Sequence, residues 1–198
     1  MIPPIDRDAA SQILKPHLPS FGDCVRRGWN RWKGETLLPM QVAKRSRACL
    51  IYDYMADEAR RTLVGVDGLT VTEDRGFVLV NVEDRLLVRF KKFDQRLRTS
   101  GIPTRQHMQF AYQQLTIDGL GPMTQLVVGY LLDEFELDIS RVAVTCSLGS
   151  RIMWVIEIPP DVGTVAPLPP TTTQPVDPIV RSKQMEDEAR EESGEAQS

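Results

Sequence analysis

The first third of the chain places hydrophobic and polar residues with helical spacing. Apolar side chains recur every three or four positions from Phe21 to Trp32. Ser20 before them and Gly34 after them are residue types that favour the two ends of a helix. The opposite face is polar and charged, so only one side of the helix needs a partner. We therefore predict a helix between Ser20 and Gly34 that packs on one side.

Two further helices flank this one in our interpretation. The longer has an apolar stripe through Ile51, Met55 and Ala59. We expect it to begin near Pro39, because proline is favoured in the first turn of a helix. A shorter helical pattern covers residues 8–15. Residues 1–65 thus form the helical part of the predicted domain.

From residue 66 the spacing becomes that of strands. Apolar runs separated by turn residues cover residues 69–72, 77–82, 86–93, 126–132, 142–146 and 152–158. Short turns between such runs are typical of hairpins. We therefore predict an α+β fold in which the N-terminal helices pack on an antiparallel sheet of about five to six strands, formed by residues 66–158. The long helix should cover one sheet face.

Residues 104–115 fit two structures. Met108 and Tyr112 lie on one side of a helix, yet the same residues alternate with polar ones as in a strand. Pro103 and Thr104 are a good helix start signal, so we favour a helix.

The end of the chain differs from the body in composition and charge. Residues 1–160 hold 21 Lys+Arg against 19 Asp+Glu, a balance of +2, whereas residues 161–198 carry −5. The segment 159–198 is rich in Pro and Thr and then acidic. It has too little apolar content to repay ordering, so we expect a disordered tail.

The composition also indicates in which cellular compartment the protein is expected. No apolar run approaches the roughly 18 to 20 residues of a membrane helix, so we expect no membrane association. The N-terminus lacks a basic start and an apolar stretch, so we expect no signal peptide there. The three cysteines, Cys24, Cys49 and Cys146, are odd in number and widely spaced. This pattern suggests buried thiols in the cytoplasm.

Recognisable catalytic motifs are absent from the sequence. The only histidines, His17 and His107, belong to no metal-binding or triad motif, and the glycine pair before Pro122 does not fit a phosphate-binding turn. We therefore assign no catalytic residue, metal ligand or cofactor. An enzyme whose site is assembled from distant residues is the hypothesis we favour least, and a deep pocket lined by His107 and carboxylates would revive it.

Clustered cations are the clearest functional signal. The residues we predict to contact an anionic partner come from the segment after residue 85, from the helix of Trp29 and from the start of the long helix. They are Arg89, Lys91, Lys92, Arg96 and Arg98, then Arg26 and Arg31, then Lys44 and Arg45. Groups that share one face could bind phosphates, with affinity that falls as salt rises. The alternative is a solvated surface in which these cations pair with carboxylates of the body.

Three segments together carry a resemblance to other proteins. The stretch RFKKFDQRLRTSGIPTRQ, the run Val128-Gly129-Tyr130-Leu131-Leu132-Asp133 and the last strand with Trp154 resemble a family of uncharacterised bacterial and phage proteins. Members are often encoded beside metallopeptidase-like proteins with a helix-turn-helix. The resemblance covers about residues 65–158. It implies a protein partner within a toxin–antitoxin or phage-defence module and gives no catalytic residues. Our first hypothesis is therefore a non-enzymatic interaction protein, and our second is a nucleic-acid-binding module.

Overall fold

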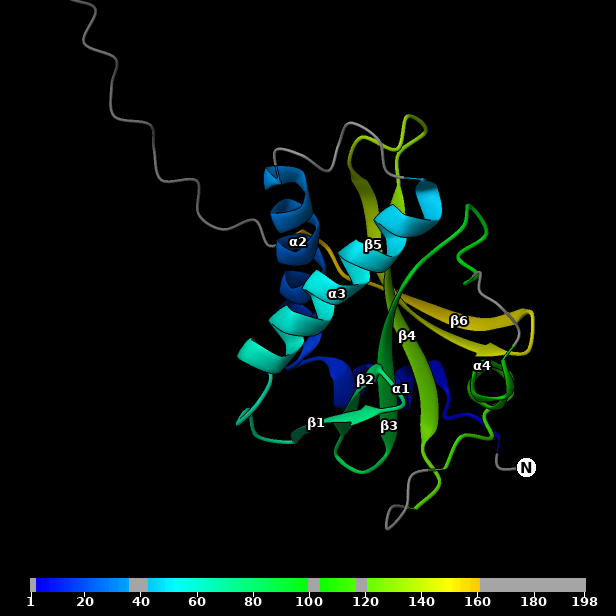
Figure 1. Ribbon diagram of the computed structural model, residues 1–198. Coiled ribbons are helices and arrows are strands. Elements are labelled where there is room, and N and C mark those ends of the chain that lie inside the picture. Colours follow the sequence, from blue (N-terminus) through cyan, green and yellow to red (C-terminus); the bar gives the residue numbers. More distant parts are fainter. Residues whose placement is uncertain (1–2, 36–42, 100–103, 117–120, 161–198) are drawn as a thin grey trace, which may run out of the picture. The chain divides into compact units, whose positions relative to one another are not determined.

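The computed structural model describes residues 3–35, 43–99, 104–116 and 121–160 (Figure 1). In chain order the elements are α1 (Arg7–Leu14), α2 (Leu18–Gly34), α3 (Lys44–Thr62), β1 (Leu69–Asp74), β2 (Phe77–Val82), β3 (Leu86–Lys92), α4 (Arg105–Ala111), β4 (Thr124–Leu132), β5 (Ile139–Leu148) and β6 (Arg151–Glu157). The predicted α+β class, with N-terminal helices and six strands in the described residues, is confirmed. The described ranges contain no helix that is both long and apolar enough to cross a membrane. Pro39 and the tail beyond residue 160 lie outside them.

Local capping explains where two of the helices begin. The hydroxyl of Thr104 accepts the backbone N–H of His107 at 3.2 Å, so residues 105–111 form a helix, as we favoured, and not a strand. The predicted start of α2 is wrong by three residues, because the N-cap is His17 and not Ser20. The helix begins at Leu18, because Pro19 sits in the first turn, where its missing N–H costs no hydrogen bond.

The sheet has the strand order β1-β2-β3-β4-β5-β6. Neighbouring strands run antiparallel in every pair but one. The exception is β3 and β4, which are parallel, with Leu86 opposite Thr124 and Lys92 opposite Tyr130. The expectation of a sheet built only from hairpins therefore fails at this pair. The connection from β3 to β4 contains α4. Such a crossover brings the chain back to the end of the sheet where β3 begins, so β4 can run parallel to β3.

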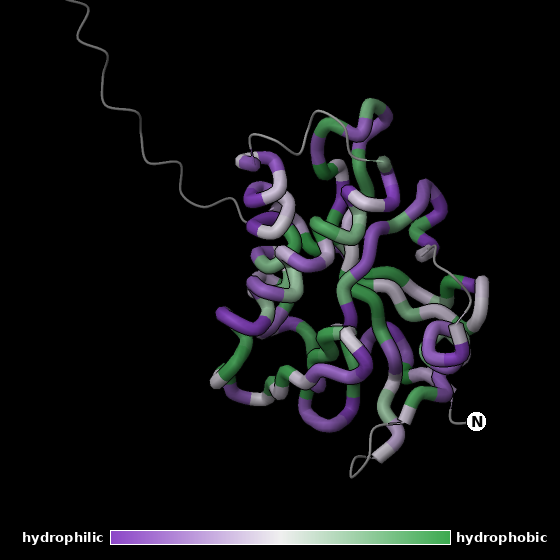
Figure 2. The backbone as a smooth tube through the Cα atoms, in the orientation of Figure 1, coloured by the Kyte–Doolittle hydropathy of each residue, from purple (hydrophilic) through white to green (hydrophobic). Residues whose placement is uncertain are grey.

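One face of the sheet is covered by the N-terminal helices. Ile51, Met55 and Ala59 of α3 are buried in the same core as Trp29 of α2 and the apolar residues of the strands. Figure 1 shows α2 and α3 lying against each other, and Figure 2 shows hydrophobic positions concentrated in the strands while the helices alternate in hydropathy. The helices touch closely at Gly28, where an added Cβ would lie 2.8 Å from the backbone nitrogen of Met55.

The other face of the sheet holds a smaller core. Leu87 of β3 and Phe93, the residue after this strand, pack there with Phe110 of α4 and with Val127 of β4. Side chains alternate across a strand, so the odd-numbered residues of β3 point to this face. Arg89 is one of them, and α4 therefore stands over an arginine as well as over apolar residues.

The strands β2 and β3 separate before β3 ends. Their pairing runs from Val82 opposite Leu86 to Leu79 opposite Arg89, whereas β3 continues to Lys92. α3 lies near this separation, because the hydroxyl of its Tyr52 accepts the backbone N–H of Val78 at 2.9 Å. The end of β3 is thus left without a neighbouring strand on one side.

Candidate functional site: a cation-lined cavity

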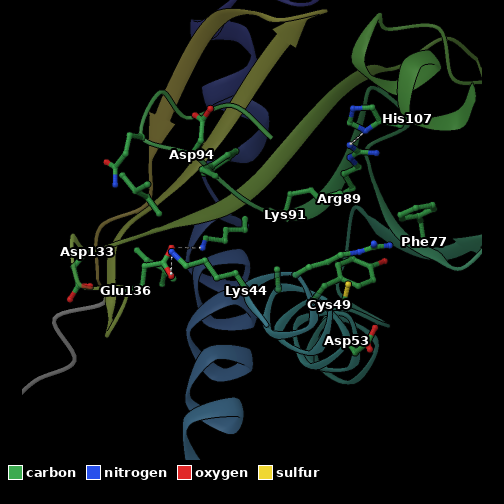
Figure 3. Close-up of a pocket in the computed structure, with 18 of the residues that line it drawn as sticks. Lys44, Cys49, Asp53, Phe77, Arg89, Lys91, Asp94, His107, Asp133 and Glu136 are labelled. Atoms are coloured by element: carbon green, nitrogen blue, oxygen red, sulfur yellow. Dashed lines mark hydrogen bonds and ion pairs between the residues drawn. The ribbon is translucent and has the colours of Figure 1, made fainter. Parts of the chain in front are cut away.

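A cavity of about 1030 Å³ lies at the separation of β2 and β3. It is lined by residues of α3, by the ends of β3 and β4 and by the segments that follow these strands (Figure 3). Because β3 and β4 are parallel, their carboxyl ends meet at the same edge of the sheet, which is where crevices for ligands form beside parallel strands. The topology therefore places the end of the basic strand in the wall of a cavity.

Arg89 is the most unusual group in this wall, because its side chain is charged and yet only 4% exposed. One of its terminal nitrogens lies 3.3 Å from Nδ1 of His107, and the guanidinium stacks 4.1 Å from the centre of the Phe110 ring. Its Nε is buried and has no hydrogen-bond partner among the described residues. Burial lowers the pKa of Arg89 to about 10. This residue therefore carries a desolvated charge.

Lys91 lies two residues further along the same face of β3. It is half-buried, and its ammonium nitrogen is 5.6 Å from the centre of the Phe77 ring. Burial lowers its pKa, and the nearby charge of Arg89 lowers it further. Within the described ranges neither cation forms an ion pair with a carboxylate. We call this part of the cavity, formed by Arg89, Lys91 and His107, the Arg89 end.

The other end of the cavity already holds an anion. Glu136 pairs with Lys92 at 3.2 Å, with Lys44 at 3.3 Å and with Arg47. Burial opposes ionisation of this carboxyl, but its hydrogen bonds with Arg47 and Lys92 outweigh that cost and hold its pKa at about 2. Figure 3 shows Glu136 with Lys44 on the side of the cavity away from Arg89 and His107. We call this part the Glu136 end.

The cavity is not basic as a whole. Five Lys or Arg residues and five Asp or Glu residues line it. The carboxylates are unevenly placed, however: Glu136 is surrounded by cations, Asp94 is bonded to Arg98, and Asp53 lies on α3 away from the Arg89–His107 pair (Figure 3). Arg89 and Lys91 are therefore the cations of the lining that are withdrawn from solvent and have no carboxylate partner in the described residues.

The structure brings together only part of the predicted contact set. Lys44, Arg45, Arg89, Lys91 and Lys92 line the same cavity. The first and third basic groups of the sequence thus share one site, and Arg89, which we expected on a binding surface, is buried because α4 covers it.

The remaining predicted cations lie elsewhere or are already engaged. Arg26 donates to the backbone carbonyl of Ile158 at 2.9 Å, and Arg31 pairs with Asp57 and Glu58. These bonds tie α2 to other parts of the fold, so the group on α2 does not extend the cavity.

The two residues that end the basic segment are outside this cavity. Arg96 is exposed, and Arg98 pairs with Asp94 at 3.1 Å. Arg98 lines a smaller neighbouring cavity of about 300 Å³, and Arg89 and His107 line both cavities.

Sequence reasoning missed the aromatic wall of the site. Tyr52 and Phe77 line the cavity as an edge-on pair with ring centres 6.4 Å apart. Cys49 also lines it and is exposed, so the prediction of a buried thiol is wrong there, although Cys24 and Cys146 are buried. Nothing in the spacing of the sequence connects Tyr52 with Phe77, because α3 and β2 meet only in the folded chain.

The cavity contains a histidine and several carboxylates, as the hypothesis of an enzyme with a site assembled from distant residues requires. The only side-chain hydrogen bond of His107 in the described residues is with Arg89, and none joins it to a carboxylate. Burial and the charges of Arg89 and Lys91 lower the pKa of His107. The described residues also contain no group of three or more His, Cys, Asp or Glu placed to hold a metal ion. The arrangement is suited to holding an anion.

Comparison of the chain with protein-family models, with curated proteins and with solved structures finds no match.

Proposed function

We propose that this chain is a non-enzymatic binding protein that receives a negatively charged group of a partner at the Arg89 end of the cavity. The observation that carries the proposal is Arg89, a buried guanidinium without a carboxylate partner in the described residues. Taking a charge out of water costs several kcal/mol unless a counter-charge is present. An anion beside Arg89 and Lys91 would supply that counter-charge, so binding is favoured there.

A binding test needs only simple anions. Phosphate and sulfate should raise the unfolding temperature at constant ionic strength, because a ligand that binds only the folded state stabilises it. Arg89→Met and Lys91→Gln should each reduce this response, whereas Arg141→Gln should not, because Arg141 is exposed and pairs with Glu157. Equal responses in all four proteins would contradict the proposal.

We further propose that the anionic group belongs to a protein, as the resemblance to toxin–antitoxin and phage-defence proteins implies. The test is co-expression with the product of the neighbouring gene, followed by size-exclusion chromatography. The two proteins should elute together, and Arg89→Met with Lys91→Gln should separate them. If the unaltered chain remains a monomer at micromolar concentration, this part of the proposal fails.

Nucleic acid is the second candidate, favoured by the exposed Lys44 and Arg45 beside the cavity and by its aromatic wall. Cations and aromatic rings together are typical of sites for single strands. Binding of a short single-stranded DNA or RNA should weaken steeply between 50 and 200 mM salt, as expected for several phosphate contacts. Arg89→Glu with Lys91→Glu should abolish it, and unchanged binding would exclude this site.

A further inference from the structure

The geometry points to a nucleoside phosphate unit as the ligand of this cavity. Its phosphate would lie between Arg89 and Lys91, and its base would pack on the wall formed by Tyr52 and Phe77. The inference rests on the proposed anion site at the Arg89 end, and it takes up the second candidate, nucleic acid, in place of an anionic group of a protein. It goes further by naming the chemical group that the anion carries.

The aromatic wall is held in place by the fold. The Tyr52 hydroxyl accepts the Val78 N–H, which fixes the ring of α3 against the start of β2. Phe77, the first residue of β2, meets this ring at an interplanar angle of 62°. Two rings fixed edge to face offer a rigid apolar surface, and a flat base can pack on such a surface at little entropic cost.

The phosphate position and the wall are next to each other. The Lys91 ammonium lies over the Phe77 ring, so the group that would hold the phosphate is also the one that touches the wall. Lysine has a flexible stem and a compact charge. Moving the ammonium from the ring to a phosphate at Arg89 would leave the ring free for the base. One ligand could then supply the phosphate to Lys91 and the base to Phe77.

The size of the cavity also favours this class of ligand. Its volume of about 1030 Å³ is at the upper end of the roughly 300–1,000 Å³ found for small-molecule sites, so a phosphate alone would leave most of it empty. A sugar and a base would fill the space towards Tyr52 and Phe77. An acidic side chain of a peptide has no ring and would leave this wall uncovered.

The first experiment compares three ligands by calorimetry with the whole chain. A nucleoside 5′-monophosphate should bind at least tenfold more tightly than ribose 5-phosphate, since a stacked base contributes about that factor or more. The nucleoside without phosphate should not bind measurably. Equal affinities of the nucleotide and ribose 5-phosphate would overturn the inference and leave the proposed function intact. Failure of every anion, inorganic phosphate included, would overturn both.

A variant tests which wall holds the base. Phe77→Leu should reduce the affinity of the nucleotide to that of ribose 5-phosphate measured with the same variant. Retention of the full preference in this variant would overturn the assignment to the Phe77 wall. The ligand comparison on the unaltered chain does not depend on whether the variant folds.

A nucleoside phosphate can be a free nucleotide or the end of a strand, and the last arm separates these sources. If a strand end is the ligand, a pentanucleotide with a 5′-phosphate should compete more strongly than both the mononucleotide and the same strand with a 5′-hydroxyl. If a free nucleotide is the ligand, the mononucleotide should compete most strongly. The two strands could instead compete equally well with each other and more strongly than the mononucleotide. That result would place binding on internal phosphates and overturn the inference.

Discussion

Replacing Arg89 with Met should make the folded chain more stable, although the change removes polar contacts. Arg89 is charged in both the folded and the unfolded states at pH 7. Its pKa of about 10 in the folded chain, against 12.5 when unperturbed, means that the folded state disfavours the charge at every pH below about 10. At about 1.4 kcal/mol per pKa unit, this difference corresponds to roughly 3 kcal/mol.

Two favourable contacts of Arg89 oppose that cost. Stacking on Phe110 contributes roughly 0.5–2 kcal/mol, and the hydrogen bond with His107 contributes roughly 1 kcal/mol. Methionine has a similar length and an apolar body, so it can keep the packing against Phe110. The net expectation is a gain of about 1 kcal/mol in the free energy of unfolding.

Urea denaturation measures this difference directly, because the midpoint moves while the slope stays constant when only stability changes. Arg141→Met is the matched control, since Arg141 is an exposed arginine on a strand, and its effect should stay within about 0.5 kcal/mol. If Arg89→Met instead lowers stability by more than 1 kcal/mol at an unchanged slope, Arg89 is a structural residue. Arg89 then carries no uncompensated charge in the folded chain.

Three further changes test the same region. Because the pKa of Glu136 is held at about 2, its ionised form stabilises the folded state above pH 4.5 and loses that effect as the pH falls towards 2. This side chain is 27% exposed, so Glu136→Gln should lower the free energy of unfolding by about 1–2 kcal/mol at pH 7. Urea denaturation should show this difference from the unaltered chain disappearing in acid. Gly129→Ala should cost about 1–3 kcal/mol, because its Cβ would lie 2.4 Å from the Lys91 carbonyl oxygen, and a midpoint equal to that of the unaltered chain would contradict this close approach. Burial lowers the pKa of His107, and the charges of Arg89 and Lys91 lower it further. Bound sulfate should offset these charges and raise this pKa in an NMR titration, and sulfate should bind more tightly in acid. A His107 pKa that does not respond to sulfate would place the anion elsewhere.

Much of the fold follows from local patterns in the sequence. The stripe through Ile51 and Met55 faces the core, and the apolar runs become strands, because burial of one face imposes a period on the residues. The cap at Thr104 decided the ambiguous segment correctly. These features depend on near neighbours along the chain, which a sequence displays.

The direction of β4 depends on distant contacts. Alternation reports which faces of a strand are buried, and it is the same for parallel and antiparallel neighbours. Residues 93–123 do hold one clue, because a segment this long with a helix inside it suits a crossover better than a hairpin. The expectation of hairpins throughout overlooked that clue.

The candidate site was predictable only in part. The alternation of β3 places Arg89 and Lys91 on one face, and this pairing is what the structure shows. Whether that face is exposed to solvent depends on whether α4 covers it, and α4 follows only after a connection through residues 93–104. A charged residue on a strand is usually exposed, so the burial of Arg89 could not be read from its neighbours.

The neutral lining of the cavity does not argue against an anionic ligand, because electrostatic energy depends on distance and on burial. At an effective dielectric constant of 20, two charges 4 Å apart interact by about 4 kcal/mol, and the interaction falls as they separate. Glu136 lies among three cations of its own and contributes little at Arg89, whereas an anion beside Arg89 would meet a charge that has already lost its water. Selectivity should therefore come from shape at the Arg89 end, since a group too large to reach Arg89 would meet only the balanced charges of the Glu136 end.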